Sequence, residues 1–327
     1  MDLTELKARY EELAPLHTRV AANIKDVLQN FLLESSVPYV SVSSRVKDFD
    51  SFCDKVDSKG YKNPFDENTD FVGVRAILYF PSDIDKISDV IKKEFAVVES
   101  EDKSDKVEWN EFGYRSHHFI VKVPGSWSAA PNYRNLTDIK IEIQIRTVLM
   151  HAWAEIEHKL QYKNRSKVPG ELRRKLARLS AKLEEADENF QDLKESIEAY
   201  KTEVAEVIGR AEVPEQLEVN IFFLQELLQT FYGRHKQEQG TADNVLEEIV
   251  EKQVTAKQII SAIHAFAPLE PWLEERFGGV MTAGNMLSFA LETIHPGFWS
   301  PDRCNDARNN RIRQLRRRAE ELGIISA

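Results

Sequence analysis

The segment Ile141–Lys163, which reads IEIQIRTVLMHAWAEIEHKLQYK, constrains the fold more than any other stretch of the chain. Its first part alternates isoleucine with Glu142, Gln144 and Arg146, and a period of two is typical of a β-strand. Its second part places large apolar residues on or near one face of a helix. The alternation puts a carboxylate, an amide and a guanidinium together on one strand face. Such a face suits metal and phosphate, although an ordinary solvated strand has the same pattern.

Composition limits the class of protein. The chain has 327 residues, enough for one large or two modest domains. Its net charge of −10 argues against coating of nucleic acid over the whole surface, but allows a local basic patch. Cys53 and Cys304 are too few and too distant for a disulfide framework or a zinc site. There is no apolar run of membrane-spanning length and no signal-peptide core, so we expect a cytoplasmic protein without a membrane partner.

Strand and helix patterns alternate through the first half of the chain. Residues 3–33 predict two amphipathic helices interrupted near Pro15. Further helices are predicted at 49–58 and 84–94 and after Arg146, and strands at 39–46, 71–80, 96–99, 118–123 and 139–146. The polar segment 124–138 is predicted as a loop. Strands interleaved with helices predict an α+β domain around a mixed sheet.

A heptad pattern of apolar residues runs from Leu172 to Val204 in alternating steps of four and three. It predicts one long helix, whose seam either contacts another copy of the chain or packs along the chain's own body. We favour intramolecular packing, because the helical patterns that follow could cover the seam. Residues 215–327 then predict several short helices separated by turn signals. The predicted domains are therefore 1–205 and 215–327, the second all-helical and of unknown role.

Four motifs carry a family resemblance. They are SRVKDFDSFCDK at 44–55, DFVGVR at 70–75, GYRSHH at 113–118 and EIQIRT at 142–147, the last followed by a helix reading HAWAEIEHKLQYK. In this order they resemble the synthetase domain of RelA/SpoT-type alarmone synthetases, and the small alarmone synthetases most closely. The resemblance implies a nucleotidyltransferase-like fold, with a mixed β-sheet flanked by helices. Here a long helix and an all-helical C-terminal region would follow it.

The resemblance also implies a reaction. Such enzymes are GTP diphosphokinases, which transfer the β,γ-pyrophosphate of ATP to the ribose 3′-OH of GTP or GDP and so make (p)ppGpp. The substrates would be ATP and GTP or GDP, with Mg²⁺ as cofactor. The chain has no His-Asp dipeptide and no room for a preceding hydrolase domain, so we expect synthesis only.

On the donor side, the resemblance implies that the guanidinium groups of Arg45 and Arg75 stack on the two faces of the adenine of ATP. Arginine provides this stacking geometry and lysine does not. Lys47, Ser51 and Lys55 follow at spacings of four on a predicted loop-to-helix turn, so they can face one phosphate chain. A common basic helix face is the alternative.

Asp70 and Glu142 are the predicted catalytic acids. The resemblance makes Asp70 a Mg²⁺ ligand, and Glu142 would share the metal and accept the 3′-OH proton. Mg²⁺ takes few carboxylates together with phosphate oxygens, which two acids on neighbouring strands would complement. Alternatively, both are exposed strand acids paired with Lys or Arg. Gly73 either lets the backbone pass close to a nucleotide or fits a bulge.

The acceptor side would begin with Tyr114, which matches the tyrosine that stacks on guanine in the family. A core tyrosine and a satisfied strand histidine are the structural alternatives. The other predicted acceptor-binding residues are Arg115, Ser116, His118, Gln144, Arg146 and His151.

The stretch before Gly113 departs from the family. It reads VEWNEF, so the 5′-phosphates of an acceptor nucleotide would meet acids there rather than bases. This leaves open a toxic small alarmone synthetase that pyrophosphorylates the 3′-CCA end of tRNA. The arginine-rich segment 303–318 is the candidate tRNA surface, although such segments more often pair with an acidic body. A third alternative is a degraded synthetase fold that only binds nucleotide. A homo-oligomer through helices is a further prediction.

Overall fold

The computed structural model describes residues 2–102, 116–160, 169–209, 217–277, 281–299 and 306–326. The chain divides into two compact units, Met1–Lys194 and Glu195–Ala327. The predicted domains, 1–205 and 215–327, stay a prediction. No helix in the described ranges is long and apolar enough to cross a membrane.

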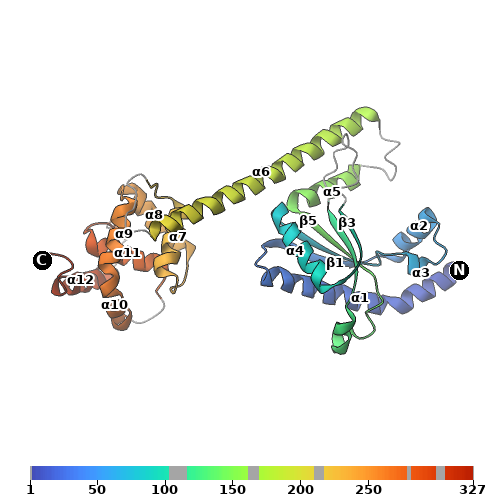
Figure 1. Cartoon of the computed structure of the whole chain (residues 1–327), viewed down its shortest axis with the longest axis horizontal. Helices are drawn as coiled ribbons and strands as arrows, with labels where there is room; N and C mark the ends of the chain where they lie inside the picture. Colours follow the sequence, from blue (N-terminus) through green and yellow to red (C-terminus); the bar gives the residue numbers. More distant parts are fainter. Residues whose placement is uncertain are drawn as a thin grey trace. The chain divides into compact units, whose positions relative to one another are not determined.

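The first unit contains a five-stranded sheet in the order β1-β2-β5-β4-β3 (Figure 1). The strands are β1 (Tyr39–Val46), β2 (Val72–Leu78), β3 (Ala96–Asp102), β4 (His117–Lys122) and β5 (Ile141–Thr147). The central strands β2 and β5 are parallel, whereas the other neighbouring pairs are antiparallel. The predicted mixed sheet is confirmed.

One face of this sheet is apolar and carries the core of the first unit. The isoleucines of β5 are fully buried there. Helices α1 (Leu3–Glu34) and α4 (Pro81–Glu94) supply the side chains that pack against them. Because side chains alternate along a strand, the residues between the isoleucines face the opposite side of the sheet. That opposite side holds the polar residues singled out in the sequence.

Helix α1 corrects the prediction of two helices separated at Pro15. It is continuous from Leu3 to Glu34, with Pro15 in its interior. A proline there removes one backbone hydrogen bond and costs about 3 kcal/mol. Packing on both sides offsets this cost, because Leu6 packs with Phe52 and Phe71, and the turns after Pro15 join the sheet core.

Of the remaining elements of the first unit, two helices lie where the sequence predicts them, whereas a short helix after Asn63 is not predicted and two 3₁₀ turns lie within the predicted loop 124–138. These elements are α2 (Phe49–Lys59), α3 (Pro64–Glu67), the short 3₁₀ turns η1 (Gly125–Ala129) and η2 (Pro131–Tyr133), and α5 (Val148–Leu160). Helix α2 begins after its N-cap Asp48 and ends at Gly60, whose φ of 66° favours glycine. Of the apolar face predicted on α5, only Trp153 is buried, while Val148, Ile156 and Leu160 are exposed.

The described part of the second unit is helical, as predicted. It comprises the end of α6 (Gly170–Ile208), then α7 (Ile221–Tyr232), α8 (Gln239–Glu251), α9 (Ala256–Phe266), η4 (Ala267–Leu269), α10 (Glu270–Phe277), α11 (Ala283–Ile294) and α12 (Asp306–Glu321). One apolar core joins these helices, with Val204 and Ile208 of α6 among its residues. The predicted fold class is confirmed.

The long predicted helix α6 is present, but its apolar seam is not covered by the first unit. Leu172, Leu179, Phe190 and Leu193 are 49%, 51%, 52% and 55% exposed. The first unit therefore does not supply the intramolecular packing that we favoured for them, and packing by the helices that follow stays a prediction. Val204, the last residue of the seam, is instead buried in the core of the second unit.

Candidate active site

The polar face of β5 is a hydrogen-bonded row. The Gln144 amide donates from Nε2 to Glu142 Oε2 at 2.9 Å, and its Oε1 accepts from an Arg146 guanidinium nitrogen at 3.0 Å. Gln144 is 8% exposed, so it makes these bonds largely out of water. The predicted cluster of carboxylate, amide and guanidinium therefore exists as one connected group.

Neighbouring strands bring further predicted residues to this row. The sheet register places Arg75 of β2 and His118 of β4 on either side of Gln144. Arg75 Nε donates to Gln144 Oε1 at 3.3 Å. His118 Nδ1 lies 2.9 Å from Glu142 Oε1, and its Nε2 lies 2.6 Å from Ser116 Oγ. Both ring nitrogens of this buried histidine are therefore used within the site.

The row combines an ionised carboxylate with protonated guanidinium groups. Burial alone raises the pKa of Glu142, but the hydrogen bonds and charge of His118, with help from Gln144 and Arg45, lower it to about 2. Burial and the nearby Arg75 lower the pKa of Arg146 to about 10, which leaves it protonated at neutral pH. Burial and Arg75 also lower the pKa of His151 and favour its neutral form. Glu142 is thus a carboxylate in a region of positive potential.

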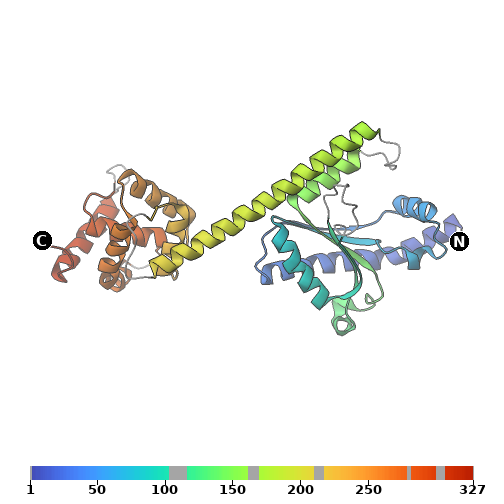
Figure 2. The same ribbon diagram turned by 45° about the horizontal axis from the view of Figure 1, so that its top comes forward.

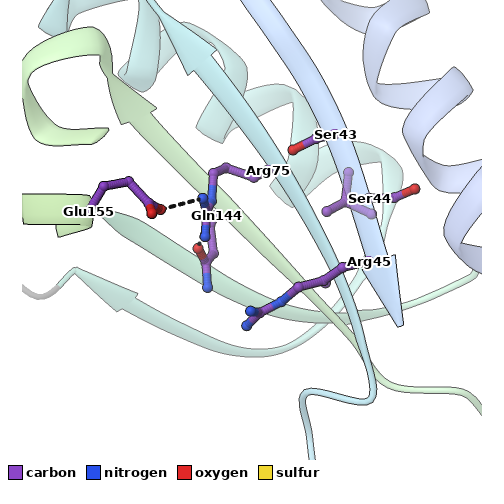
Figure 3. A pocket seen from close by; sticks show the side chains of 8 residues that line it. Ser43, Ser44, Arg45, Arg75, Gln144 and Glu155 are labelled. Atoms are coloured by element: carbon purple, nitrogen blue, oxygen red, sulfur yellow. Dashed lines mark hydrogen bonds and ion pairs between the residues drawn. The ribbon is translucent and has the colours of Figure 1, made fainter. Parts of the chain in front are cut away.

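Over the sheet face formed by β1, β2 and β5, beside α5, lies a cavity of about 200 Å³ that is flanked by two guanidinium groups (Figure 3). Its lining residues are Ser43, Ser44, Arg45, Gly73, Val74, Arg75, Gln144 and Glu155. Gly73 pairs with Arg45 on one side and Glu142 on the other in regular register, which does not support the bulge alternative. A Cβ at Gly73 would lie 3.4 Å from Arg45 Cγ and Nε, so the glycine leaves this guanidinium room to lie across the sheet.

Glu155 of α5 is a pocket residue that the sequence interpretation missed. Its carboxylate accepts from Arg75 at 3.2 Å and lies 3.9 Å from His151 Nδ1. The available signal was the spacing of four from His151 to Glu155, which places both side chains on one helix face. His151, predicted on the acceptor side, is therefore connected to the residues of the cavity.

A second cluster surrounds Asp70, just before β2. Asp70 Oδ2 pairs with Lys47 and Lys55, each at 2.9 Å. The two lysines converge as predicted, although here they converge on a carboxylate. Ser51 lies in the first turn of α2, where its backbone N–H donates to the N-cap Asp48. A phosphate chain at this turn would compete with Asp70 for the lysines.

The residues present fit a magnesium ion that substrate phosphates help to hold. Among the described residues, the buried Oδ1 of Asp70 has no hydrogen-bond partner, so it is available as a ligand. Within the described ranges, no group of three or more His, Cys, Asp or Glu could hold a metal ion. Mg²⁺ characteristically binds through one or two carboxylates plus phosphate oxygens, and such a site needs no third acidic residue.

Part of the predicted acceptor site is outside the described residues. Tyr114 and Arg115 belong to this part, together with the acidic flank VEWNEF. Ser116 and His118 are described and adjoin Glu142 as stated above. The roles assigned to all these residues stay predictions.

The arginines of α12 are largely engaged within the second unit. Arg316 pairs with Glu292 at 2.9 Å, and Arg318 with Glu321 at 2.8 Å. Arg308 lies over the Trp299 ring at 4.2 Å. These contacts agree with pairing to the chain's own body, the alternative that we favoured over tRNA. A tRNA partner stays a prediction.

Fold and site together define an α+β protein with a cluster of arginines and an ionised acid on one face of a mixed sheet, and comparison with known proteins identifies its family. Residues 44–167 match the family model described as the region found in RelA / SpoT proteins. The chain is 32% identical to GTP pyrophosphokinase YwaC of Bacillus subtilis (strain 168) over 173 residues, which cover 51% of this chain and 79% of the relative. It is 30% identical to GTP pyrophosphokinase YjbM of the same strain over 164 residues, which cover 49% and 74%.

A solved structure agrees with these matches. The crystal structure of small alarmone synthetase 1 from Bacillus subtilis is similar with a TM-score of 0.50 and 27% identity, covering 58% of this chain and 98% of that one. The chain belongs to the RelA/SpoT family, as its motifs predict. Both named relatives are GTP pyrophosphokinases, the enzyme class that the sequence predicts.

Proposed function

We propose that this chain is a GTP pyrophosphokinase, which transfers the β,γ-pyrophosphate of ATP to the ribose 3′-OH of GTP or GDP and releases AMP. The observation that carries the proposal is the row Glu142–Gln144–Arg146, connected to Arg75 in a chain whose relatives are GTP pyrophosphokinases. Phosphoryl transfer asks little covalent chemistry of a protein, and depends on positioning and charge stabilisation. An ionised acid surrounded by guanidinium groups suits both needs.

The donor nucleotide would occupy the cavity over β1, β2 and β5. Guanidinium planes stack on a flat base, and Arg45 and Arg75 flank this space. The phosphate chain would extend toward Lys47 and Lys55, which lie close enough together to share one carboxylate oxygen. Arg146 would complete the positive potential over the transferred group.

Asp70 and Glu142 would hold Mg²⁺ together with the phosphates of the donor. When bound, Mg²⁺ supplies charge neutralisation and polarises phosphate oxygens. The pKa of Glu142, about 2, suits a metal ligand, but it makes this carboxylate a weak proton acceptor. We therefore assign Glu142 first to orienting the metal and the 3′-OH. His118, bonded to the same carboxylate, would hold it in place.

The test is to offer labelled ATP with Mg²⁺ to GDP, GTP, ATP and deacylated tRNA in parallel. We expect AMP release and a 3′-pyrophosphorylated guanosine nucleotide. Labelling confined to tRNA would replace this proposal with the toxin alternative, and labelling of no acceptor would favour the nucleotide-binding module. A cytoplasmic location and a homo-oligomer accompany this function as predictions.

Glu142→Gln tests the principal residue. Because the amide keeps the shape but loses the charge, we expect turnover to fall by about a hundredfold to a thousandfold, the range typical of removing one charge-stabilising group. Binding of a non-hydrolysable ATP analogue should stay within a few fold. Glu99→Gln on β3, an exposed strand acid, is the matched control. Activity retained in Glu142→Gln would remove this residue from the catalytic role.

A further inference from the structure

Helix α6 contacts the first unit through polar residues. Ser180 and Asp187 are 0% and 3% exposed, and Gln191 and Lys194 follow Asp187 at spacings of four and three on the same helix face. The apolar seam of the same segment is half-exposed, as described above. Figure 1 and Figure 2 both show this part of α6 beside α5. A buried polar face on a surface helix indicates specific attachment rather than general hydrophobic packing.

The first attachment is to the start of α4. Gln191 Oε1 accepts from the backbone N–H of Ser82 at 3.2 Å. Lys194 Nζ pairs with the buried carboxylate of Asp83 at 3.1 Å, and lies 4.7 Å from the centre of the Phe80 ring. Ser82 and Asp83 belong to the first turn of α4, which follows the central strand β2. The end of α6 in the first unit is therefore fixed to the strand that carries Arg75.

The second attachment is to the start of α5. Thr147, the last residue of β5, donates from Oγ1 to Asp187 Oδ2 at 2.5 Å. The same hydroxyl accepts the backbone N–H of Met150 at 3.1 Å, so it caps the first turn of α5. Asp187 orients the hydroxyl for this role, because a hydroxyl that donates to the aspartate has its lone pairs free for the helix N–H.

Helix α5 in turn reaches the donor cavity. It carries Glu155, which accepts from Arg75 at 3.2 Å and lines the cavity. A rotation of α5 about its first turn would withdraw Glu155 from Arg75 and release one side of the cavity. The contacts form a continuous series from Asp187 through Thr147, α5 and Glu155 to Arg75.

We propose that Asp187 is a positioning residue for the ATP pocket, acting through the Thr147 cap and Glu155 on the orientation of Arg75. The inference rests on the proposed function, since it assigns the cavity to the donor nucleotide. Because α6 also supplies Val204 and Ile208 to the core of the second unit, the helix that positions the pocket is shared by both units.

The expected effect is on donor binding. Glu155 is more than half exposed, so its pair with Arg75 is screened by water and supplies at most about a fivefold change in affinity. Asp187→Ala should therefore raise the KM for ATP and the Kd of a non-hydrolysable ATP analogue by about twofold to fivefold. The KM for GDP should change less than twofold. Asp187→Asn keeps an oxygen that accepts from Thr147, and should restore most of the affinity.

The matched control is Glu188→Ala, the next residue of α6, which is exposed and outside the attachment. Thr147→Val tests the same bond from the other side, so the result does not depend on the folding of one variant. If Asp187 and Thr147 act through one bond, the double variant should bind the analogue with the same Kd as the single variant that binds it less tightly. Thermal unfolding of every variant separates loss of positioning from loss of fold.

Three results would overturn the inference: an unchanged analogue Kd in Asp187→Ala, equal losses for ATP and GDP, or additive losses in the double variant. Binding of the analogue is measured without turnover, so the inference is tested separately from the reaction. If the wild-type chain binds the analogue but transfers nothing to any guanosine nucleotide, the proposed function fails while the Asp187 effect on binding stands or falls on its own.

Discussion

Removing Gln144 is the sharpest test of the polar row, because this one side chain connects Glu142, Arg75 and Arg146. Gln144→Met keeps the side-chain volume but deletes bonds of 2.9 Å, 3.0 Å and 3.3 Å. Glu142 retains His118 and Arg75 retains Glu155, but the buried Nε of Arg146 already has no hydrogen-bond partner in the described part of the chain. The loss therefore falls mainly on Arg146.

The magnitude follows from these bonds. A hydrogen bond to a charged group contributes about 1.5–3 kcal/mol, and the bond at 3.3 Å adds little. Since Glu142 and Arg146 recover part of their hydration when Gln144 is lost, we expect destabilisation by about 3 kcal/mol. For a unit of this size, each kcal/mol corresponds to about 2–4 °C, so the melting temperature of the first unit should fall by about 6–12 °C.

Differential scanning calorimetry of Gln144→Met measures this change. The control is Gln225→Met on α7, where the glutamine is exposed and the melting temperature should move by less than about 1 °C. Gln144→Glu adds a second comparison: it keeps both arginine partners but faces Glu142 with a like charge, so it should also destabilise. A decrease in melting temperature of less than about 2 °C in Gln144→Met would refute the argument that the row is a connected structural unit.

Two further predictions concern stability. His17 is buried against Phe71, and burial lowers its pKa. Folding therefore favours neutral His17. The free energy of unfolding is unaffected by this histidine above its unfolded pKa of about 6.5, and it falls as the pH drops below that value. The melting temperature should therefore drop more between pH 7.5 and pH 5.5 in the wild type than in His17→Phe. An equal drop in both proteins would contradict this. Arg316→Met should lower the free energy of unfolding in urea by about 3 kcal/mol, because among the described residues it leaves buried Glu292 with backbone donors alone. The exposed control Arg317→Met should cost under about 0.5 kcal/mol, and equal costs would argue against the buried pair.

Much of the first unit could be predicted because its sequence patterns are locally consistent. The alternation in β5 determines which side chains share a face, and this was enough to place Glu142, Gln144 and Arg146 together. Glu155 could not be recognised in the same way, because its partner Arg75 is on a strand far away in the sequence. Likewise, the pairing of Lys47 and Lys55 with Asp70 depends on tertiary placement, and no spacing in the sequence encodes it.

Helix α6 shows why a pattern can predict an element and yet mislead about its packing. Hydrophobic periodicity identifies the face on which burial would stabilise most, and Leu172, Leu179 and Phe190 define that face clearly. The face used by the first unit instead carries Ser180 and Asp187, which a sequence pattern reads as solvent-exposed. A buried aspartate is stable only when it is paired, and one of its partners, Thr147, is 40 residues away. The exposed seam then remains an apolar surface on a helix already fixed by polar bonds, which is why the predicted helix-mediated oligomer still has a physical basis.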